Sequence, residues 1–164
     1  MKTLYLHGLH ATPSEEKTAI LKDEFGLEVI APEIDYEKHA GSLDLFDYLA
    51  GLIEKEKIRI IIGSSFGGYM GFHLSEFCQI PGYLFNPALS GKSLQVPVRM
   101  ERSDIKKFII IGKHDEIIDP EKTKEYVWKK DYKNTFIIEE NFGHQTEPKL
   151  FGSLLEQTDL IHLK

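Results

Sequence analysis

A serine between glycines offers the most specific chemistry in the sequence. Ser65 is the centre of a Gly-x-Ser-x-Gly motif that follows the strongly apolar residues 58–62 and precedes the helical pattern of residues 66–77. Between a buried strand and a helix, this motif forms a sharp turn that exposes the serine hydroxyl as a nucleophile. Ser64 does not fit the motif, because Ile62 stands where the first glycine should be. Ser65 is therefore the predicted nucleophile, and a glycine-rich turn with an ordinary helix cap is the alternative.

An acid and a base that could serve this serine follow two later apolar runs, which are expected to be strands. Asp115 comes after the first of these runs and His144 after the second. Asp119 competes for the acid role, but it precedes Pro120 and is explained as the N-cap of a helix with proline at its first position. Asp115 has no such explanation and is the predicted acid, with Glu116 a lesser candidate. His144 would remove the serine proton, while Asp115 would orient and stabilise the imidazole.

The segment after the first apolar run could stabilise an oxyanion. Acyl transfer needs two N–H donors aimed at the oxygen that becomes negative. One is expected from the backbone of Phe66, directly after the nucleophile, and the other from Leu9, in the His-Gly loop after the first run. His7 is expected to hold this loop by hydrogen bonds, and His10 is a candidate for lining the substrate pocket. A metal site at His7 and His10 is not expected, because further ligands at suitable spacing are missing.

These groups need a framework that gathers the ends of several strands. Short apolar runs alternate with amphipathic segments along the whole chain, which predicts a parallel sheet with helices on both faces. The expected strands are residues 4–6, 27–31, 58–62, 82–85, 108–111 and 135–138, and the expected helices are residues 14–25, 43–56, 66–77, 120–130 and 149–157. The predicted fold is thus a three-layer α/β/α sandwich with a doubly wound, mainly parallel sheet of about six strands. Ligands bind beyond the carboxyl ends of such strands, where Ser65, Asp115 and His144 are expected.

Length and composition favour one ordinary globular domain over residues 1–164. The chain has 41% hydrophobic and 28% charged residues, as is usual for a globular protein. A formal net charge of −6 and the absence of basic runs argue against a nucleic-acid partner. The lone cysteine, Cys78, builds no disulfide framework and is expected to be a small buried residue. No export signal or membrane span is recognised, so we expect a cytoplasmic protein with no membrane partner, and no cofactor is expected.

The motifs together resemble those of a known family. The resemblance is carried by Leu4-Tyr5-Leu6-His7-Gly8, Gly63-Ser64-Ser65-Phe66-Gly67-Gly68, Asn86-Pro87-Ala88, Asp115 and Gly143-His144. Over essentially the whole length, the chain is similar to the small bacterial YqiA-like esterases of the α/β-hydrolase superfamily. The resemblance implies a minimal α/β-hydrolase without the first two strands or a lid domain, carboxylic-ester hydrolysis, and a triad of Ser65, Asp115 and His144. Leu9 departs from the pattern, since an aromatic residue is expected there in many relatives, and the pocket shape would differ accordingly.

The segment between the fourth and fifth predicted strands is the expected wall of the substrate pocket. Residues 86–104 are too few for a helical lid domain but many for an ordinary loop. Its apolar side chains are candidates for contacts with an acyl group, and these are Leu89, Leu94, Val96 and Met100. The alternative interpretation is a surface loop that covers the core.

The sequence therefore predicts a serine hydrolase that acts on small-molecule carboxylic esters with short acyl groups. The reaction would use a Ser-His-Asp triad and an acyl-enzyme intermediate. Three alternatives stay open: a thioesterase, an amide or peptide hydrolase with the same triad, and a catalytically idle hydrolase fold that serves as a binding module.

Overall fold

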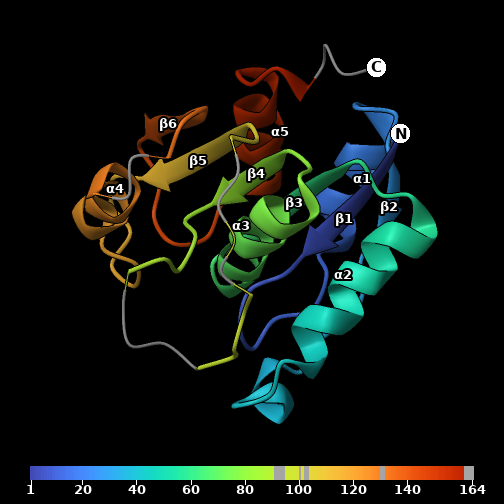
Figure 1. Cartoon of the computed structure of the whole chain (residues 1–164). Coiled ribbons are helices and arrows are strands. Elements are labelled where there is room, and N and C mark those ends of the chain that lie inside the picture. Colours follow the sequence, from blue (N-terminus) through green and yellow to red (C-terminus); the bar gives the residue numbers. More distant parts are fainter. Residues whose placement is uncertain (91–94, 100, 102–103, 130–131, 161–164) are drawn as a thin grey trace.

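One parallel sheet with helices on both sides organises the chain. The structure, a computed structural model, describes residues 1–90, 95–99, 101, 104–129 and 132–160 (Figure 1). Six strands pair in the order β2-β1-β3-β4-β5-β6, and every pair is parallel. The strands are β1 (Lys2–Leu6), β2 (Glu28–Ile30), β3 (Ile60–Ser64), β4 (Gly82–Phe85), β5 (Lys107–Gly112) and β6 (Thr135–Glu140). The helices are α1 (Glu15–Asp23), α2 (Asp44–Glu56), α3 (Phe66–Cys78), α4 (Pro120–Lys129) and α5 (Pro148–Glu156), with a 3-10 turn, η1, at Tyr36–His39. The predicted α/β/α sandwich is confirmed.

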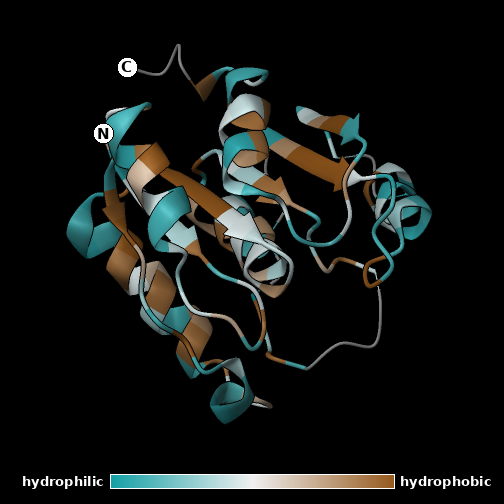
Figure 2. Cartoon of the chain, turned by 180° about the vertical axis from the view of Figure 1, so that it is seen from behind, coloured by the Kyte–Doolittle hydropathy of each residue, from teal (hydrophilic) through white to brown (hydrophobic). Residues whose placement is uncertain are grey.

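The two faces of the sheet carry different helices. Leu4 and Leu6 of β1 pack in the cluster formed with α2 and α3, whereas Tyr5 packs in the cluster formed with α1 and α5. In β5, Ile109 lies in the cluster with α3 and α4, whereas Ile110 lies in the cluster with α1 and α5. In Figure 2 the strands in the centre of the molecule are mostly brown, the colour of hydrophobic residues. The helices carry hydrophilic residues, drawn in teal, on their outer sides. Alternation along each strand therefore builds a separate core on each face.

Because all the strands run in one direction, their carboxyl ends share one edge of the sheet. Leu6 is paired with Gly63, and Ser64 is paired with Phe85. Strands β5 and β6 stay paired up to their last residues. The segments that follow β1, β3, β4, β5 and β6 are thus brought side by side, and these segments contain the predicted site residues.

The central strand begins later than the apolar run predicts. Helix α2 ends at Glu56 and is capped by Lys57, which has a left-handed conformation (φ 56°), and the N–H of Ile58 donates to the carbonyl of Ile53 at 3.0 Å. Ile58 therefore closes the helix, and β3 begins at Ile60. The strand runs two residues further than expected at its other end, through Ser64, so that Ser65 follows it directly.

Candidate functional site

Ser65 lies on a strained turn between β3 and α3. Its backbone has φ 53° and ψ −116°, a conformation that a residue with a side chain rarely adopts. A Cβ atom on Gly67 would lie 2.3 Å from the carbonyl oxygen of His7, and a Cβ atom on Gly63 would lie 2.5 Å from the carbonyl oxygen of Gly67. The glycines of the motif are therefore required by close backbone approach, as the motif predicts. The N–H of Ser65 donates to the carbonyl of Phe85 at 2.9 Å and ties the turn to β4.

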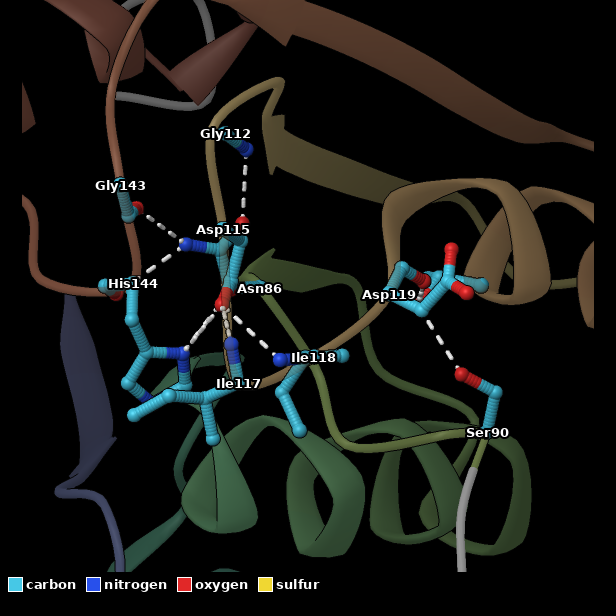
Figure 3. Close-up of polar contacts among 10 residues, drawn as sticks. Asn86, Ser90, Gly112, Asp115, Ile117, Ile118, Asp119, Gly143 and His144 are labelled. Atoms are coloured by element: carbon cyan, nitrogen blue, oxygen red, sulfur yellow. Dashed lines mark hydrogen bonds and ion pairs between the residues drawn. The ribbon is translucent and has the colours of Figure 1, made fainter.

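Asp115 and His144 form a hydrogen-bonded pair at the ends of β5 and β6 (Figure 3). His144 Nδ1 lies 2.9 Å from Asp115 Oδ2. The Asp115 side chain is 1% exposed, and its Oδ1 accepts the N–H groups of Ile117 and Ile118 at 2.8 and 2.9 Å. Because an ionised carboxylate only accepts, Nδ1 is the donor, and a neutral imidazole in this position is the Nδ1–H tautomer. This tautomer leaves Nε2 with a free lone pair that can accept a proton.

Asp119 has the structural role that the sequence assigns to it. Its Oδ1 accepts the N–H groups of Glu121 and Lys122 at 3.0 and 3.3 Å, and Pro120 is the first residue of α4. Asp119 is therefore the N-cap of α4. The capping role of Asp119, which was predicted from the proline that follows it, is confirmed.

Asn86, at the end of β4, contacts the loops that carry both Asp115 and His144. Its Nδ2 donates to the carbonyls of Gly143 and His144 at 3.0 and 3.1 Å, and its Oδ1 accepts the N–H of Gly112 at 2.7 Å. Figure 3 shows this side chain next to the Asp115–His144 pair. Asn86 belongs to the motifs that resemble the family, but the sequence predicts no role for it. Its only signal is a polar residue at the carboxyl end of a buried strand.

The loop after β1 is held by His7, as predicted. His7 Nε2 accepts the N–H of Ile34 at 2.9 Å, so Nδ1 carries the proton and donates to the carbonyl of Gly8 at 2.8 Å. The hydroxyl of Tyr36 donates to the carbonyl of His7 at 2.9 Å. These bonds fix the backbone just before Leu9, whose N–H is one of the two predicted oxyanion donors.

A cavity of about 360 Å³ lies beside the turn that carries Ser65, and Ser65 and His144 both line it. Leu9 and Gly8 form part of its wall, and a Cβ atom on Gly8 would lie 3.9 Å from Ser65 Oγ. Phe66 is the first residue of α3, so its N–H has no partner inside the helix. The structure therefore gathers Ser65, His144 and Leu9 at one cavity, with the Phe66 backbone next to Ser65.

Polar groups form much of the remaining wall. Lys17 and Glu16 come from the first turn of α1, and Glu147 comes from the segment before α5. Burial lowers the pKa of Lys17, while the nearby Glu147 carboxylate opposes this shift. Burial raises the pKa of Tyr5, which also lines the cavity, to about 12, so its hydroxyl stays protonated near neutral pH. The cavity thus offers few apolar contacts to a long acyl chain.

His10, a candidate for the pocket wall, lies outside this cavity. Its side chain is exposed, and Nε2 is 3.8 Å from a carboxylate oxygen of Glu37. It lines a separate hollow of about 290 Å³ together with residues 33–37. The loop turns His10 away from Ser65 at a left-handed residue, since His10 itself has φ 57°.

Two of the expected acyl contacts in the segment 86–104, Leu89 and Val96, do not line the cavity of Ser65. Leu89 is buried against α3, β5 and α4, and Val96 is buried against α2 and α3. They cover the core instead, as the alternative interpretation supposes. Leu94 and Met100 lie outside the described residues.

Residues 1–90, 95–99, 101, 104–129 and 132–160 contain no group of three or more His, Cys, Asp or Glu side chains that could hold a metal ion. None of the helices in these ranges combines the length and hydropathy needed to cross a membrane. Cys78 is half-buried, and burial raises the pKa of its thiol to about 11.

Solved structures share this fold at low sequence identity. The monoacylglycerol lipase of Paleococcus ferrophilus has 15% identity and a TM-score of 0.75, with 99% of this chain and 95% of that chain covered. The fluorophosphonate-binding serine hydrolase F of Staphylococcus aureus has 16% identity and a TM-score of 0.69, with 98% and 83% covered. The carboxylesterase of Bacillus cereus has 18% identity and a TM-score of 0.64, with 97% and 87% covered. The chain therefore has the fold of the α/β-hydrolases.

Sequence comparison assigns the chain to a protein family, which the shared fold alone does not do. A search of the curated proteins found no match. A family model, however, matches residues 2–95, which contain the His-Gly loop, the turn at Ser65 and Asn86. With this match and its α/β-hydrolase fold, the chain belongs to the uncharacterised protein family UPF0227, the YqiA-like family.

Proposed function

We propose that this protein is a serine hydrolase that cleaves small carboxylic esters with Ser65 as nucleophile, His144 as base and Asp115 as the orienting acid. The observation that carries the proposal is the pairing of His144 with a buried carboxylate, in a cavity that His144 shares with Ser65 on its strained turn. A histidine held in this tautomer accepts the proton of an attacking serine. Structural neighbours named as a lipase, a carboxylesterase and a serine hydrolase support the same chemistry.

In the first half of the reaction, Ser65 Oγ attacks the ester carbonyl while its proton passes to His144 Nε2. The carbonyl oxygen becomes negative and is stabilised by the backbone N–H groups of Leu9 and Phe66. The C–O bond to the alcohol then breaks, and the proton on Nε2 passes to the leaving oxygen. Asp115 stabilises the imidazolium between these two transfers.

In the second half, water hydrolyses the acyl-enzyme. His144 takes a proton from the water as it attacks the acyl carbon, and the same two N–H groups stabilise the second oxyanion. The ester bond to Ser65 breaks, and the proton on His144 returns to Ser65 Oγ. A cavity of about 360 Å³ with charged residues in its wall is suited to a short acyl group.

Fluorophosphonate labelling with hydrolysis of a short-chain p-nitrophenyl ester tests the proposal. The wild-type protein and Ser64→Ala should be labelled and should turn over the ester, whereas Ser65→Ala should do neither. Ser64 is the matched control, because it is the adjacent residue and lines the same cavity. Mass spectrometry of the labelled peptide should place the adduct on residue 65.

Each alternative predicts a different result. A catalytically idle binding module would leave the folded wild-type protein unlabelled and without turnover. A thioesterase or an amidase would be labelled at Ser65 but would turn over a thioester or an anilide faster than the matched ester. Labelling of Ser65→Ala equal to that of the wild type would show that the nucleophile is another residue.

A further inference from the structure

The segment of residues 86–88 is hydrogen-bonded to the backbone of Ser65 and to the loops that carry Asp115 and His144. The Asn86 side chain binds the backbone at Gly112 and at His144, and the N–H of Ala88 donates to the carbonyl of Ser65 at 3.0 Å. The N–H of Asp115 in turn donates to the carbonyl of Gly112 at 3.1 Å, so Gly112 and Asp115 belong to one tight turn. One short segment after β4 therefore connects the nucleophile turn, the acid loop and the base loop.

Asparagine is chemically specific at the centre of this connection. The residue is 3% exposed, and its side chain uses both of its polar atoms: Oδ1 accepts one N–H, and the Nδ2 group donates to two carbonyls. Aspartate has the same shape but no donor, and leucine has neither donor nor acceptor. Asn86 also has φ 42°, in the left-handed region that asparagine enters more readily than most residues.

The only side-chain hydrogen bonds of His144 among the described residues are those to Asp115, so the ring depends on its backbone for placement. Its own carbonyl and that of Gly143 are bound by the Asn86 amide. Gly112, which is bound by the same side chain, begins the turn that presents Asp115. Asn86 thus fixes the backbone on both sides of the Asp115–His144 hydrogen bond.

We propose that Asn86 is a positioning residue that sets the Asp115–His144 pair relative to Ser65. It touches no reacting atom and acts through the two loops that it connects. The proposal rests on the function proposed above, because it assigns Asn86 a role in that same triad. A displacement of a catalytic group by about 1 Å can lower the rate about 10²-fold, and a loss of this order in kcat is expected when the Asn86 side chain is changed.

Two variants separate this role from a general role in folding. Asn86→Gly removes the side chain but tolerates positive φ, and Asn86→Asp keeps the shape while placing acceptors against two carbonyl oxygens. Asn134, which is exposed, supplies a control of the same residue type and backbone conformation. It is also an asparagine with positive φ (54°), and its Nδ2 donates to the carbonyl of Asp104 at 2.8 Å, but it precedes β6 at the opposite edge of the sheet.

The first measurement is steady-state hydrolysis of the short-chain ester by folded protein. Asn86→Gly and Asn86→Asp should lose about 10²-fold in kcat with little change in KM, because substrate contacts remain while the base is displaced. Asn134→Gly and Asn134→Asp should keep the wild-type kcat. Circular dichroism establishes that each variant is folded at the assay temperature.

The second measurement does not depend on turnover. The proton that His144 Nδ1 donates to Asp115 should give a low-field proton NMR signal, which is identified by its loss in His144→Gln. This signal should shift or broaden in both Asn86 variants and stay in place in both Asn134 variants. If the wild-type protein shows the signal but hydrolyses no ester, the proposed function fails while the positioning role is still measured.

Three results would overturn the proposal. The first is a kcat within about twofold of the wild type in Asn86→Gly together with an unchanged NMR signal. The second is a change confined to KM. The third is unfolding of both Asn86 variants while both Asn134 variants fold, because Asn86 would then be needed for the fold and not for the placement of the triad.

Discussion

At Asp115, both carboxylate oxygens lie within hydrogen-bond distance of His144 Nδ1, at 3.1 Å for Oδ1 and 2.9 Å for Oδ2. Oδ1 accepts two backbone N–H groups, while Oδ2 lies closest to the histidine. Asp119 makes a similar pair of backbone hydrogen bonds, but within the described part of the chain it has no histidine partner. The two aspartates are therefore matched in their local backbone role and differ in the group that they orient.

Exchange of each aspartate for asparagine should separate these roles. In Asp115→Asn, the amide oxygen can still accept the N–H groups of Ile117 and Ile118, so its NH₂ group faces His144 Nδ1 and forces the imidazole proton onto Nε2. In a serine protease the same exchange lowers kcat about 10⁴-fold. Asp119→Asn should stay near the wild-type rate, because asparagine caps helices as well as aspartate does. The measurement is kcat for a short-chain ester, and equal losses in the two variants would contradict the assignment.

The base assignment predicts a pH dependence. Hydrolysis should slow as the pH falls, because only a neutral imidazole accepts the proton of Ser65. His144→Ala should lose most of the rate together with this acid limb. His10→Ala is the control, since His10 is exposed and lies outside the cavity, and it should keep both the rate and the profile. The check is kcat/KM from about pH 5 to pH 8, and an unchanged profile in His144→Ala would rule out this base.

Single residues differ in how far the sequence could assign them. The Asp119 cap could be predicted, because a following proline is a local signal with a known geometry. The exposure of His10 and the burial of Leu89 could not, since both depend on how a loop turns in three dimensions. The hydrogen bonds of Asn86 join residues far apart in the chain, and no local pattern encodes them.

At the scale of elements, the positions of strands and helices followed the hydrophobic pattern, while their ends followed hydrogen bonds that the pattern does not contain. Strand β3 begins at Ile60 and not at the predicted Ile58, because the N–H of Ile58 is bonded to the end of α2. The short turn η1 was not predicted, although Tyr36 within it is buried and binds the backbone of His7. Apolar periodicity thus located the elements, and caps and turns decided their limits.

The turn between β3 and α3 yields a prediction about stability. Gly67→Ala would place a Cβ atom 2.3 Å from the carbonyl oxygen of His7 and 2.4 Å from that of Leu6, so α3 must move away from β1. Overpacking usually costs about 1–3 kcal/mol, and a clash with two backbone oxygens should reach at least the upper part of this range. The measurement is the free energy of unfolding from urea denaturation.

Gly51→Ala is the matched control in an exposed part of α2. A Cβ atom there meets nothing within 4 Å, and alanine favours a helix over glycine by up to about 1 kcal/mol. The variant should therefore be as stable as the wild type or more stable. A Gly67→Ala protein with wild-type stability would show that α3 and β1 tolerate more separation than their contact implies.

For the molecule as a whole, strand–helix alternation predicted a parallel sheet, but it did not predict which strands are neighbours. The order β2-β1-β3-β4-β5-β6 puts β3 and β4 in the middle of the sheet. Ser65 and Asn86 therefore follow the two central strands, with the acid and base loops on one side and the His7 loop on the other. This order depends on the packing of all the helices together. It brings the acid loop, the base loop and the His7 loop to the same part of the sheet.

The other end of the sheet holds a buried ion pair that the chemistry does not use. Lys107 begins β5, and its ammonium group is paired with the carboxylate of Glu76 in α3; both side chains are wholly buried. The ammonium group also lies 5.5 Å from the ring centres of Phe72 and Tyr132. The neighbouring Lys106 is paired with Asp159, but its side chain is 45% exposed. The two lysines are adjacent in sequence and differ mainly in burial.

This difference predicts unequal contributions to stability. Lys107→Met removes the ammonium partner of the buried Glu76 carboxylate, a loss that typically costs about 3–5 kcal/mol, whereas Lys106→Met breaks an exposed pair that typically contributes about 1 kcal/mol or less. Urea denaturation measures both variants. Folded Lys107→Met should keep the wild-type kcat for the short-chain ester, because Lys107 lies at the amino end of β5, away from the triad. A loss below about 1 kcal/mol in Lys107→Met would show that contacts other than the one with Lys107 stabilise the buried carboxylate, or that it takes up a proton.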